Sequence, residues 1–566
     1  MARAFGRGPG ACYTLGHMRP PAERAAVAAL LLALAAQLAY GLRTDGVTND
    51  EVLYVAAGWR QVALGDYRLN TTHPPLAPDV AALGLLGLRP QAPPLGPGDD
   101  VLAYAYRFLH VANDARAVIT RARVPVLLLT LLLALLAWWW ARTCAGAAAG
   151  LLALALLAFH PTLLAHGHLA TTDLPAAFAM LAASFAFFRW TCRPQAAWAA
   201  ATAALLGLAG ATRLTALALL PCFALLAAGR IVRARGAERA AAWRHTALLA
   251  AVCVVLVPLS IWCAYGFHDP PVEPAGGARA PAGAAARVLD AAGRLHLVPA
   301  AYVESIRFQI DHNRRGHLAY LRGERSRQGW LSYFPIAFAV KSTPGWLAAL
   351  LLAAVGGWRT RAGTGPGPQG HWLLPALVSF AAVALGHIQI GERYLLPVHV
   401  YLVLWAATRL GPWIGQLRPA VAAALVAGVL GAHAVPALAV LPRGHLAYFN
   451  LLAGGPDGGH RVLLDSNLDW GQDLPRLARW MRARGEASVR LGYMGADDPR
   501  RFGIACEDLP GANLYSRAPP GPLSGTVVVS PNLVFGLVPA VAATYAPLRE
   551  RSPDERAGVF FVYRLP

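Results

Sequence analysis

Long apolar stretches recur along most of the chain and are separated by short polar connections. The first covers residues 25–42. Ten more follow at 124–141, 146–165, 174–188, 196–211, 214–229, 246–266, 333–355, 372–388, 394–409 and 419–438. Each is nearly long enough for a helix across a hydrocarbon core of roughly 30 Å, although the shorter ones need tilt. The pattern predicts an α-helical polytopic membrane protein with about eleven transmembrane helices.

The first apolar stretch allows two interpretations. The basic residues before it, Arg3, Arg7, Arg19 and Arg24, are also typical of a secretory signal peptide. No small-x-small cleavage site closes the stretch, and further apolar stretches follow it. We therefore expect a retained signal anchor, preceded by a cytoplasmic basic leader at residues 1–24.

Three long segments are more polar than the rest. Segments 43–123 and 267–332 are predicted to be outer loops of a transmembrane domain covering residues 25–442, and residues 270–286 have the composition of a flexible loop. Residues 443–566 contain a helical pattern near 474–485 and strand-like runs at Val489–Tyr493, Thr526–Ser530 and Val559–Tyr563. This tail is predicted to be a small extracytoplasmic α/β domain.

Composition agrees with a membrane protein. Hydrophobic residues make up 56% of the 566 positions and charged residues only 14%, whereas ordinary soluble domains carry about 25% charged residues. Such a chain cannot cover a large water-facing surface, so a large soluble enzyme, a coiled coil and a disordered protein are disfavoured. The 7 cysteines suggest no disulfide framework, since several fall in or beside apolar stretches.

The net charge of +20 comes almost entirely from arginine, because Lys341 is the only lysine. In a soluble protein this excess would suggest nucleic acid. Here many arginines lie in short connections, and these fall on one side of the membrane if the N-terminus is cytoplasmic, as the positive-inside rule requires. We therefore expect a multi-pass membrane protein with an extracytoplasmic C-terminal domain and no nucleic-acid partner.

The first outer loop begins with two adjacent carboxylates, Asp50 and Glu51, which follow Thr48 and Asn49. Such carboxylates repel each other, so one of them is expected to be protonated or paired with a cation. An aspartate here could deprotonate an acceptor hydroxyl as a general base. The residues also fit a helix N-cap, with Asn49 or Asp50 as the cap and Glu51 completing the pattern. The two interpretations are compatible.

Histidines mark two further places in the outer loops. His73 precedes two prolines and a helix start, where backbone N–H groups favour anions, so a phosphate contact, a metal contact and a plain turn are all open. His166 and His168 alternate as in a strand, and two histidines alone make only a weak metal site. Asp173 starts an apolar stretch, where an ionisable group suggests function, although it could equally cap a helix.

Basic residues at the outer ends of later stretches have two possible roles. Arg213, Lys341 and Arg393 could extend to the membrane interface, or they could hold a lipid phosphate. Arg322 belongs to an arginine-rich part of the second long loop, which is either a solvated loop or a lid over an anionic headgroup. No Walker, dinucleotide, serine-hydrolase or zinc-protease motif occurs, so we expect no nucleotide cofactor, and the energy must arrive with the substrate.

Taken in order, these motifs resemble the GT-C superfamily of polytopic glycosyltransferases. The similarity is to the dolichyl-phosphate-mannose–protein mannosyltransferase family (glycosyltransferase family 39) and its bacterial relatives, and it runs through most of the chain. The string from Asp465 to Leu474 is unusually specific for bacterial members. The segments that carry the resemblance are Asn49–Glu51, His73–Leu76, His166–Pro175, Ala319–Glu324, Tyr333–Pro335, Ile390–Pro397, Ala447–Asn450 and Asp465–Leu474.

The resemblance implies inverting transfer of a sugar, mannose or another hexose or pentose, from a polyprenyl-phosphate donor at the outer face of a bacterial inner membrane. It assigns catalytic roles to Asp50, with Glu51 as its companion, and to Asp173. Binding of the donor and acceptor phosphates is assigned to the basic residues of the outer loops, above all Arg213 and Arg393. His73 and Lys341 are weaker candidates. Some relatives use a divalent cation and others do not.

Two features depart from the family. Arg213 stands where many members have lysine. The loop 267–332 is too short for the sugar-binding domain inserted in eukaryotic members, which leaves the acceptor open between protein Ser/Thr, lipid and glycan. The alternative function is a transporter or flippase of lipid-linked sugars, which would require inverted repeats and broken helices near the bilayer midplane. The enzyme hypothesis instead requires Asp50 and Asp173 to meet at one cavity.

Overall fold

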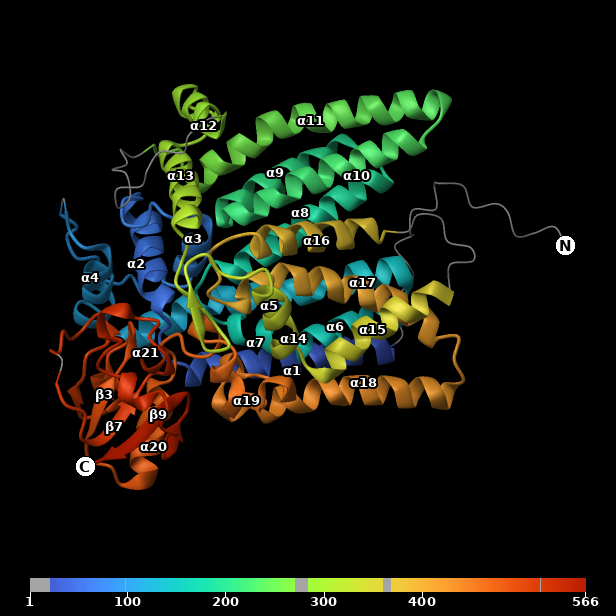
Figure 1. The fold of residues 1–566 in the computed structure, drawn as a ribbon. Coiled ribbons are helices and arrows are strands. Elements are labelled where there is room, and N and C mark those ends of the chain that lie inside the picture. The colour runs from blue at the N-terminus through green and yellow to red at the C-terminus, as the bar shows by residue number, and fades with distance from the viewer. Residues whose placement is uncertain (1–20, 97, 270–283, 360–367, 520) are drawn as a thin grey trace.

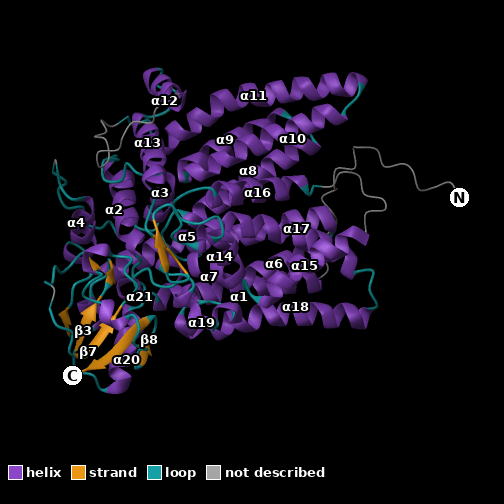
Figure 2. Cartoon of the chain, in the orientation of Figure 1, coloured by secondary structure: helices purple, strands orange, loops and turns teal. Residues whose placement is uncertain are grey.

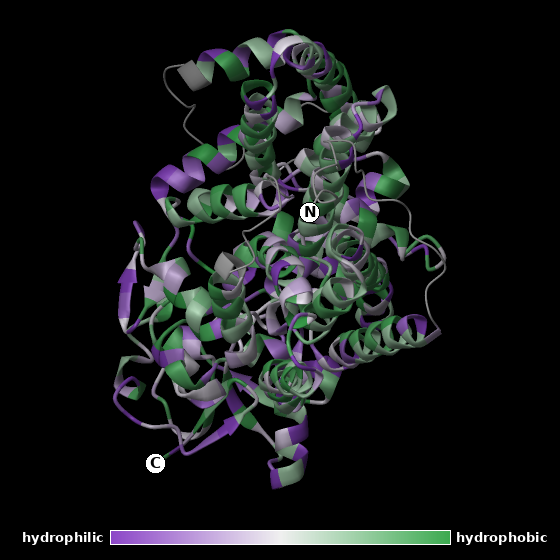
Figure 3. Ribbon diagram, turned by 90° about the vertical axis from the view of Figure 1, so that its right-hand side faces the viewer, coloured by the Kyte–Doolittle hydropathy of each residue, from purple (hydrophilic) through white to green (hydrophobic). Residues whose placement is uncertain are grey.

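The computed structural model describes residues 21–96, 98–269, 284–359, 368–519 and 521–566. Most of the predicted leader and most of the proline-rich stretch 270–286 lie outside the described residues. Long helices run roughly parallel through the membrane part, and the C-terminal strands lie at one end of them (Figures 1 and 2). In Figure 3 many helices are seen end-on, and hydrophobic residues predominate on them.

Every predicted apolar stretch is helical. Stretches 146–165 and 333–355 are each broken into two helices, and 214–229 begins with a 3₁₀ turn. The helices are α1 (Pro21–Thr44), α5 (Ala115–Ala145), α6 (Ala147–Ala158), α7 (Pro161–His166), α8 (Asp173–Cys192), α9 (Ala196–Thr212), α10 (Leu219–Arg233), α11 (Gly236–Ala264), α14 (Tyr333–Lys341), α15 (Pro344–Arg359), α16 (Gly370–Ala384), α17 (Leu396–Ile414) and α18 (Pro419–Ala439).

Six helical segments among the described residues are long and apolar enough to cross a membrane. Helices α14 and α15 make a seventh if they count as one span, with a bend of 111° between them. Helices α6, α9 and α16 are apolar but shorter. The chain is therefore a multi-pass membrane protein, and the count of eleven spans stays a prediction.

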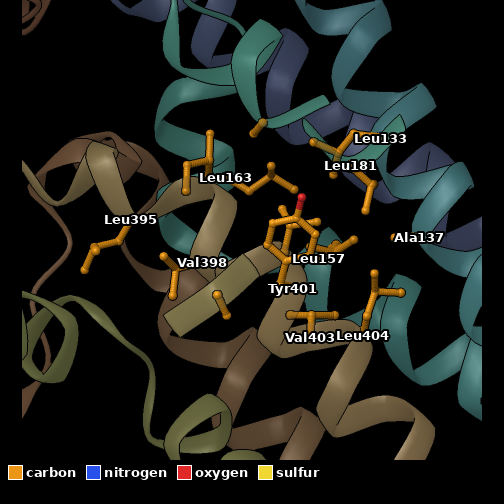
Figure 4. Packing of buried hydrophobic residues seen from close by; sticks show 14 of the residues in the cluster. Leu133, Ala137, Leu157, Leu163, Leu181, Leu395, Val398, Tyr401, Val403 and Leu404 are labelled. Atoms are coloured by element: carbon orange, nitrogen blue, oxygen red, sulfur yellow. The ribbon is translucent and has the colours of Figure 1, made fainter. Parts of the chain in front are cut away.

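Alanine and leucine dominate these helices because both are strong helix formers. Small residues also let helices approach closely. A side chain at Gly207 in α9 would come within 2.6 Å of the Val257 oxygen in α11. One buried polar group of the core, the Tyr401 hydroxyl, is paired: it lies 2.7 Å from the Ser184 hydroxyl of α8 and donates to the Met180 oxygen at 3.0 Å. Figure 4 shows Tyr401 among the apolar side chains that surround it.

The two long outer segments are folded. The first contains α2 (Asn49–Leu64), α3 (Leu76–Leu83), α4 (Val101–Tyr106) and a short π-helix at Arg107–Val111. The described part of the second contains α12 (Ala284–Arg294), α13 (Ala300–Arg315) and a small hairpin of β1 (Ala319–Leu321) and β2 (Glu324–Ser326). Helices α2, α3 and α13 lie at the end of the bundle nearest to the C-terminal strands (Figure 1).

The C-terminal part is a small α/β unit. Its sheet has the order β5-β3-β7-β9-β8, in which β3 is parallel to β5 and β7, and β9 is antiparallel to β7 and β8. Helix α20 packs on one face. The elements are α19 (Gly455–Gly458), α20 (Leu474–Arg484), β3 (Val489–Gly492), β4 (Met494–Gly495), β5 (Cys506–Asp508), β6 (Ala512–Asn513), β7 (Gly525–Val529), α21 (Pro531–Val534), β8 (Glu555–Ala557) and β9 (Phe560–Leu565).

An acid in α3 makes the stability of the fold depend on pH. Asp79 has a buried Oδ1 without a hydrogen-bond partner among the described residues, and burial raises its pKa to about 8. An unfolded aspartate ionises near pH 4, so unfolding releases this proton between about pH 4 and 8. The free energy of unfolding therefore falls as pH rises through that window.

We expect Asp79→Asn to remove this loss, because the amide carries no proton to release. The variant should gain on the order of 2 kcal/mol over wild type at pH 8 and much less near pH 5. Thermal unfolding of the purified protein in detergent across this range measures the gain. Parallel pH profiles of the two proteins would contradict the assignment.

Candidate active site

A cavity of about 460 Å³ lies at the end of the helix bundle nearest to the C-terminal strands. Its walls come from α2, α8, α13, α16 and the segments that precede α3, α10 and α17. Part of the lining is charged or polar: Asn49, Asp50, Thr72, His73, Thr172, Asp173, Arg213, Gln309, His312, Asn313, His317 and Arg393. Another part is apolar: Ala176, Met180, Leu214, Ala382, Val383, Ile388, Ile390 and Pro397.

Four charged side chains form one cluster in this cavity. Arg393 Nη1 lies 2.9 Å from Asp50 Oδ2 and 3.3 Å from Asp173 Oδ2. Arg213 pairs with the other oxygen of Asp173. Asp173 is fully buried, whereas the Asp50 side chain is 30% exposed. Asp50 is therefore the more accessible carboxylate, and Asp173 holds both arginines.

Backbone geometry at helix ends places these four residues. Asp50 is in the first turn of α2 and Asp173 is the first residue of α8. Arg213 follows α9 with extended backbone, and Arg393 lies in a 3₁₀ turn (Glu392–Leu395) before α17. Because all four helix ends meet at one end of the bundle, residues far apart in the sequence converge.

Glu51, predicted to accompany Asp50 in catalysis, does not line the cavity. Its carboxylate accepts hydrogen bonds from Arg123 at 2.7 and 2.8 Å, from the N–H of Ala170 at 2.8 Å and from the N–H of Thr48 at 3.0 Å. Burial alone would raise the pKa of Glu51, but the Arg123 cation and these hydrogen bonds outweigh it and lower the pKa. Glu51 thus ties α2 to α5 and to the short connection between α7 and α8.

The predicted helix cap is present with one correction. The residue before α2 is Thr48, and its N–H bonds to Glu51, so the cap is neither Asn49 nor Asp50. Asp50 is consequently free to face the cavity. The capping pattern and the candidate catalytic group therefore coexist in one helical turn.

His73 lines the cavity, as the phosphate-contact interpretation requires, but it is not a cation there. Burial, together with the charges of Arg213 and Arg393, lowers the pKa of His73 to about 3. Its Nδ1 lies 3.0 Å from the Thr72 hydroxyl. A neutral His73 can exchange hydrogen bonds with a ligand but adds no positive charge.

Lys341 and Arg322 lie outside the cavity lining. The Lys341 ammonium is buried and donates to the Leu446 and Asn467 oxygens at 2.8 and 2.7 Å, so it anchors the start of the C-terminal part. Arg322 is exposed near the β1–β2 hairpin. The structure therefore brings neither predicted phosphate ligand to the aspartates.

The two metal candidates, His166 and His168, also lie outside the lining. His166 ends α7 and His168 lies in the turn that follows, so the expected strand was wrong. His168 Nε2 is 3.0 Å from Asp45 Oδ2. Within the described ranges, no three His, Cys, Asp or Glu side chains are grouped so that they could hold a metal.

Sequence analysis missed two aromatic rings that contact the arginines. The Arg213 guanidinium carbon is 4.5 Å from the centre of the Tyr394 ring, and that of Arg393 is 4.0 Å from the centre of the Trp470 ring. Tyr394 directly follows Arg393 in the segment Ile390–Pro397, so its place in the sequence could have indicated a position near the site. Nothing local in the sequence relates Trp470 to Arg393.

The arrangement suits chemistry on an anionic ligand. A phosphate in the cavity could take hydrogen bonds from both guanidinium groups, whose negative partners hold them in place. A carboxylate that is partly accessible beside them could accept a proton from a hydroxyl. The apolar lining suits a hydrocarbon chain attached to the phosphate.

Known proteins resemble this chain in sequence and in fold. Residues 27–268, which include both aspartates and Arg213, match the family described as dolichyl-phosphate-mannose-protein mannosyltransferase. The chain superposes on the Pmt1-Pmt2 protein O-mannosyltransferase complex of S. cerevisiae bound to the sugar donor, with TM-score 0.52 and 11% identity, covering 76% of this chain and 91% of that one. The chain has the GT-C fold.

Two further structures match at lower TM-scores. ArnT from Cupriavidus metallidurans in the apo state gives TM-score 0.46 and 16% identity, over 95% of this chain and 98% of that one. The same protein bound to undecaprenyl phosphate gives 0.46 and 15%, over 95% and 97%. No curated protein matches the chain. The predicted fold class, a helical membrane protein with a small C-terminal strand-containing region, is confirmed.

Proposed function

We propose that this GT-C protein is a glycosyltransferase that uses a polyprenyl-phosphate sugar as donor. It transfers the sugar, with inversion, to an acceptor hydroxyl at the outer face of the membrane. The observation that carries the proposal is the meeting of Asp50, Asp173, Arg213 and Arg393 in one cavity that also has an apolar wall.

In the proposed reaction the acceptor oxygen attacks the anomeric carbon of the sugar, and Asp50 takes the hydroxyl proton. The bond between that carbon and the phosphate oxygen breaks, and its electron pair leaves with the polyprenyl phosphate. This anion needs no protonating acid. Arg213 and Arg393 stabilise its charge, and such electrostatic support is the larger expected contribution to the rate.

Asp173 acts on the two arginines in this proposal. Each of its oxygens pairs with a different guanidinium group, and its side chain is fully buried. It therefore orients both cations toward the cavity without contacting the acceptor. Asp50 shares Arg393 with it, so the proton acceptor and the leaving-group ligands form one connected network.

The apolar wall suits the first isoprene units of a polyprenyl chain. Ala176 and Met180 of α8 face the cavity together with Ala382 and Val383 of α16. A chain placed there would run from the arginines into the hydrocarbon region. The arginine distribution supports a cytoplasmic N-terminus and an extracytoplasmic C-terminal domain. The resemblance of residues Asp465–Leu474 to bacterial members supports a bacterial inner membrane.

A divalent cation, which some relatives use, finds few donors in this cavity. Asp50 and Asp173 are already paired with arginines, and the neighbouring His73 is bonded to Thr72. These residues do not make the donor set that a bound cation needs. No step is therefore assigned to a metal.

A flippase of lipid-linked sugars is the competing function. The bend between α14 and α15 is one feature that it predicts. The charged cluster, however, lies at one end of the helix bundle, whereas a transporter site is expected near the bilayer midplane. A partly accessible carboxylate beside two arginines favours a chemical reaction over transport of the lipid-linked sugar.

Glycoproteomics of the envelope and secreted fractions tests the proposal, with the native strain compared with a strain carrying Asp50→Asn. Loss of hexose from Ser/Thr peptides is the expected result for a protein acceptor. If the peptides are unchanged, we expect the glycolipids or the polysaccharides of the Asp50→Asn strain to lose the sugar instead. A variant strain with all three unchanged would reject the glycosyltransferase and leave the flippase.

A further inference from the structure

Trp470 contacts two segments that carry charges of the cluster, the start of α2 with Asp50 and the 3₁₀ turn with Arg393. Its backbone oxygen accepts a hydrogen bond at 3.0 Å from the N–H of Asn49, the residue before Asp50. Its ring lies against the guanidinium group of Arg393, at 4.0 Å from the centre of the ring. The residue is 2% exposed, so the ring has little freedom to move.

Trp470 belongs to residues 465–473, which we term the tail string. Ser466 of the string donates to the oxygen of Ile390 at 2.7 Å. The side-chain oxygen of Asn467 accepts from the N–H of Glu392 at 2.8 Å. The backbone just before Arg393 is therefore held by the tail string at two points.

The same string holds the segment that leads into α2. The oxygen of Gln472 accepts from the N–H of Gly46 at 2.7 Å. Just beyond the string, Arg476 forms an ion pair with Asp45 at 2.7 Å, and both side chains are buried. Asp50 and Arg393, which are far apart in sequence, are thus both fixed to one short stretch.

The tail string is itself anchored on both sides. The amide of Asn532, in α21 of the C-terminal unit, donates to the oxygen of Asp469 at 2.8 Å, and the Ser530 hydroxyl bonds to the Asp469 carboxylate. On the membrane side, Lys341 donates to the oxygen of Asn467 at 2.7 Å. The string therefore forms a bridge between the C-terminal sheet and the helix bundle.

We propose that the tail string positions the two halves of the active site, with Trp470 as the positioning residue that aligns Arg393 with Asp50. The proposal rests on the function proposed above. An aromatic ring attracts a guanidinium group without neutralising it. Arg393 is thereby oriented without a third negative charge beside Asp50 and Asp173.

Two substitutions separate the ring from the backbone contact. Trp470→Leu removes the ring, Trp470→Phe keeps one, and both retain the carbonyl that binds Asn49. We expect Trp470→Leu to lower kcat/KM for the polyprenyl-phosphate sugar, and to weaken binding of radiolabelled undecaprenyl phosphate, by roughly 10-fold. Trp470→Phe should stay within roughly 3-fold of wild type.

Trp480→Leu is the matched control, because Trp480 is a half-buried tryptophan of α20 that does not line the cavity. It should leave both quantities unchanged. Thermal unfolding in detergent is measured for each variant. The proposal is overturned if Trp470→Leu behaves like wild type, or if the Leu and Phe variants lose activity only in proportion to lost stability.

The outcomes also separate this inference from the proposed function. If wild type binds undecaprenyl phosphate but transfers no sugar, the function fails, while lipid binding by the Trp470 variants still tests the alignment. If wild type is active, Asp50→Asn is inactive and Trp470→Leu equals wild type, the function stands and the positioning role fails.

Gly391→Ala independently tests the hydrogen bond by which Ser466 of the tail string holds the backbone before Arg393. The backbone of Gly391 is extended, so alanine is allowed, but its side chain would overlap the hydroxyl of Ser466. Ser466 must then rotate away and lose its bond to Ile390. We expect kcat/KM to fall roughly 5-fold, and Ser466→Ala, which removes the same hydrogen bond without a clash, to show a fall of similar size. Wild-type kinetics of Gly391→Ala would contradict a positioning role for the contact between Ser466 and Ile390.

Discussion

Asp50→Asn is expected to abolish sugar transfer while the protein stays folded. Asparagine keeps the shape of the side chain and can still accept a hydrogen bond from Arg393, but it cannot take a proton from the acceptor hydroxyl. Loss of a general base typically costs about 10²–10⁴-fold in rate. The measurement is initial-rate transfer from a polyprenyl-phosphate sugar by purified protein in lipid vesicles.

A matched control is Asp457→Asn in the C-terminal part. Asp457 is also paired with an arginine, Arg443, but both side chains are more than half exposed and neither lines the cavity. This variant should transfer sugar at the wild-type rate, since exposed ion pairs contribute little. Wild-type turnover by Asp50→Asn would remove Asp50 from the mechanism.

Glu51→Gln should instead destabilise the protein. Arg123 and Glu51 are 1% and 0% exposed, and the Arg123 guanidinium would keep its charge without a counterion. Breaking such a buried pair costs about 3–5 kcal/mol. We expect a large fall in the thermal unfolding midpoint and in the yield of folded protein, and activity per folded molecule should change less than in Asp50→Asn.

A double variant sharpens this test. In Glu51→Leu/Arg123→Leu no buried charge is left alone, so part of the stability should return. Recovery is expected to be partial, because Arg123 also donates to the oxygens of Asp45 and Gly46 at 2.8 and 2.6 Å. If Glu51→Gln unfolds like wild type but is inactive, Glu51 belongs to the chemistry after all.

The membrane architecture could be predicted from sequence because its causes are local. A stretch of apolar residues must form a helix in lipid, where each backbone group needs an internal partner. The strands of the C-terminal unit were found for a similar reason: β3, β7 and β9 each begin within one residue of the predicted run. The breaks after α6 and α14 were missed, because hydropathy alone does not mark where a helix bends.

The sequence by itself also singled out all four clustered charges, Asp50 and Asp173 as candidates for catalysis and Arg213 and Arg393 as candidates for phosphate binding. Asp50 and Asp173 stand at polar-to-apolar boundaries, where an ionisable residue is costly and therefore noticeable. The sequence also indicated Glu51 as a catalytic companion of Asp50. Neighbours on a helix point in directions about 100° apart, and only packing against α5 shows that Glu51 faces Arg123 and Asp50 faces the cavity.

How these basic residues are placed was decided by the tertiary structure alone. Lys341 was a weaker candidate for phosphate binding than Arg393; it anchors the C-terminal part, whereas Arg393 bridges the two aspartates. Arg393 is 343 positions from Asp50 and 220 from Asp173. Contacts over such distances arise when helix ends are brought together by packing of the whole bundle, which no local pattern encodes.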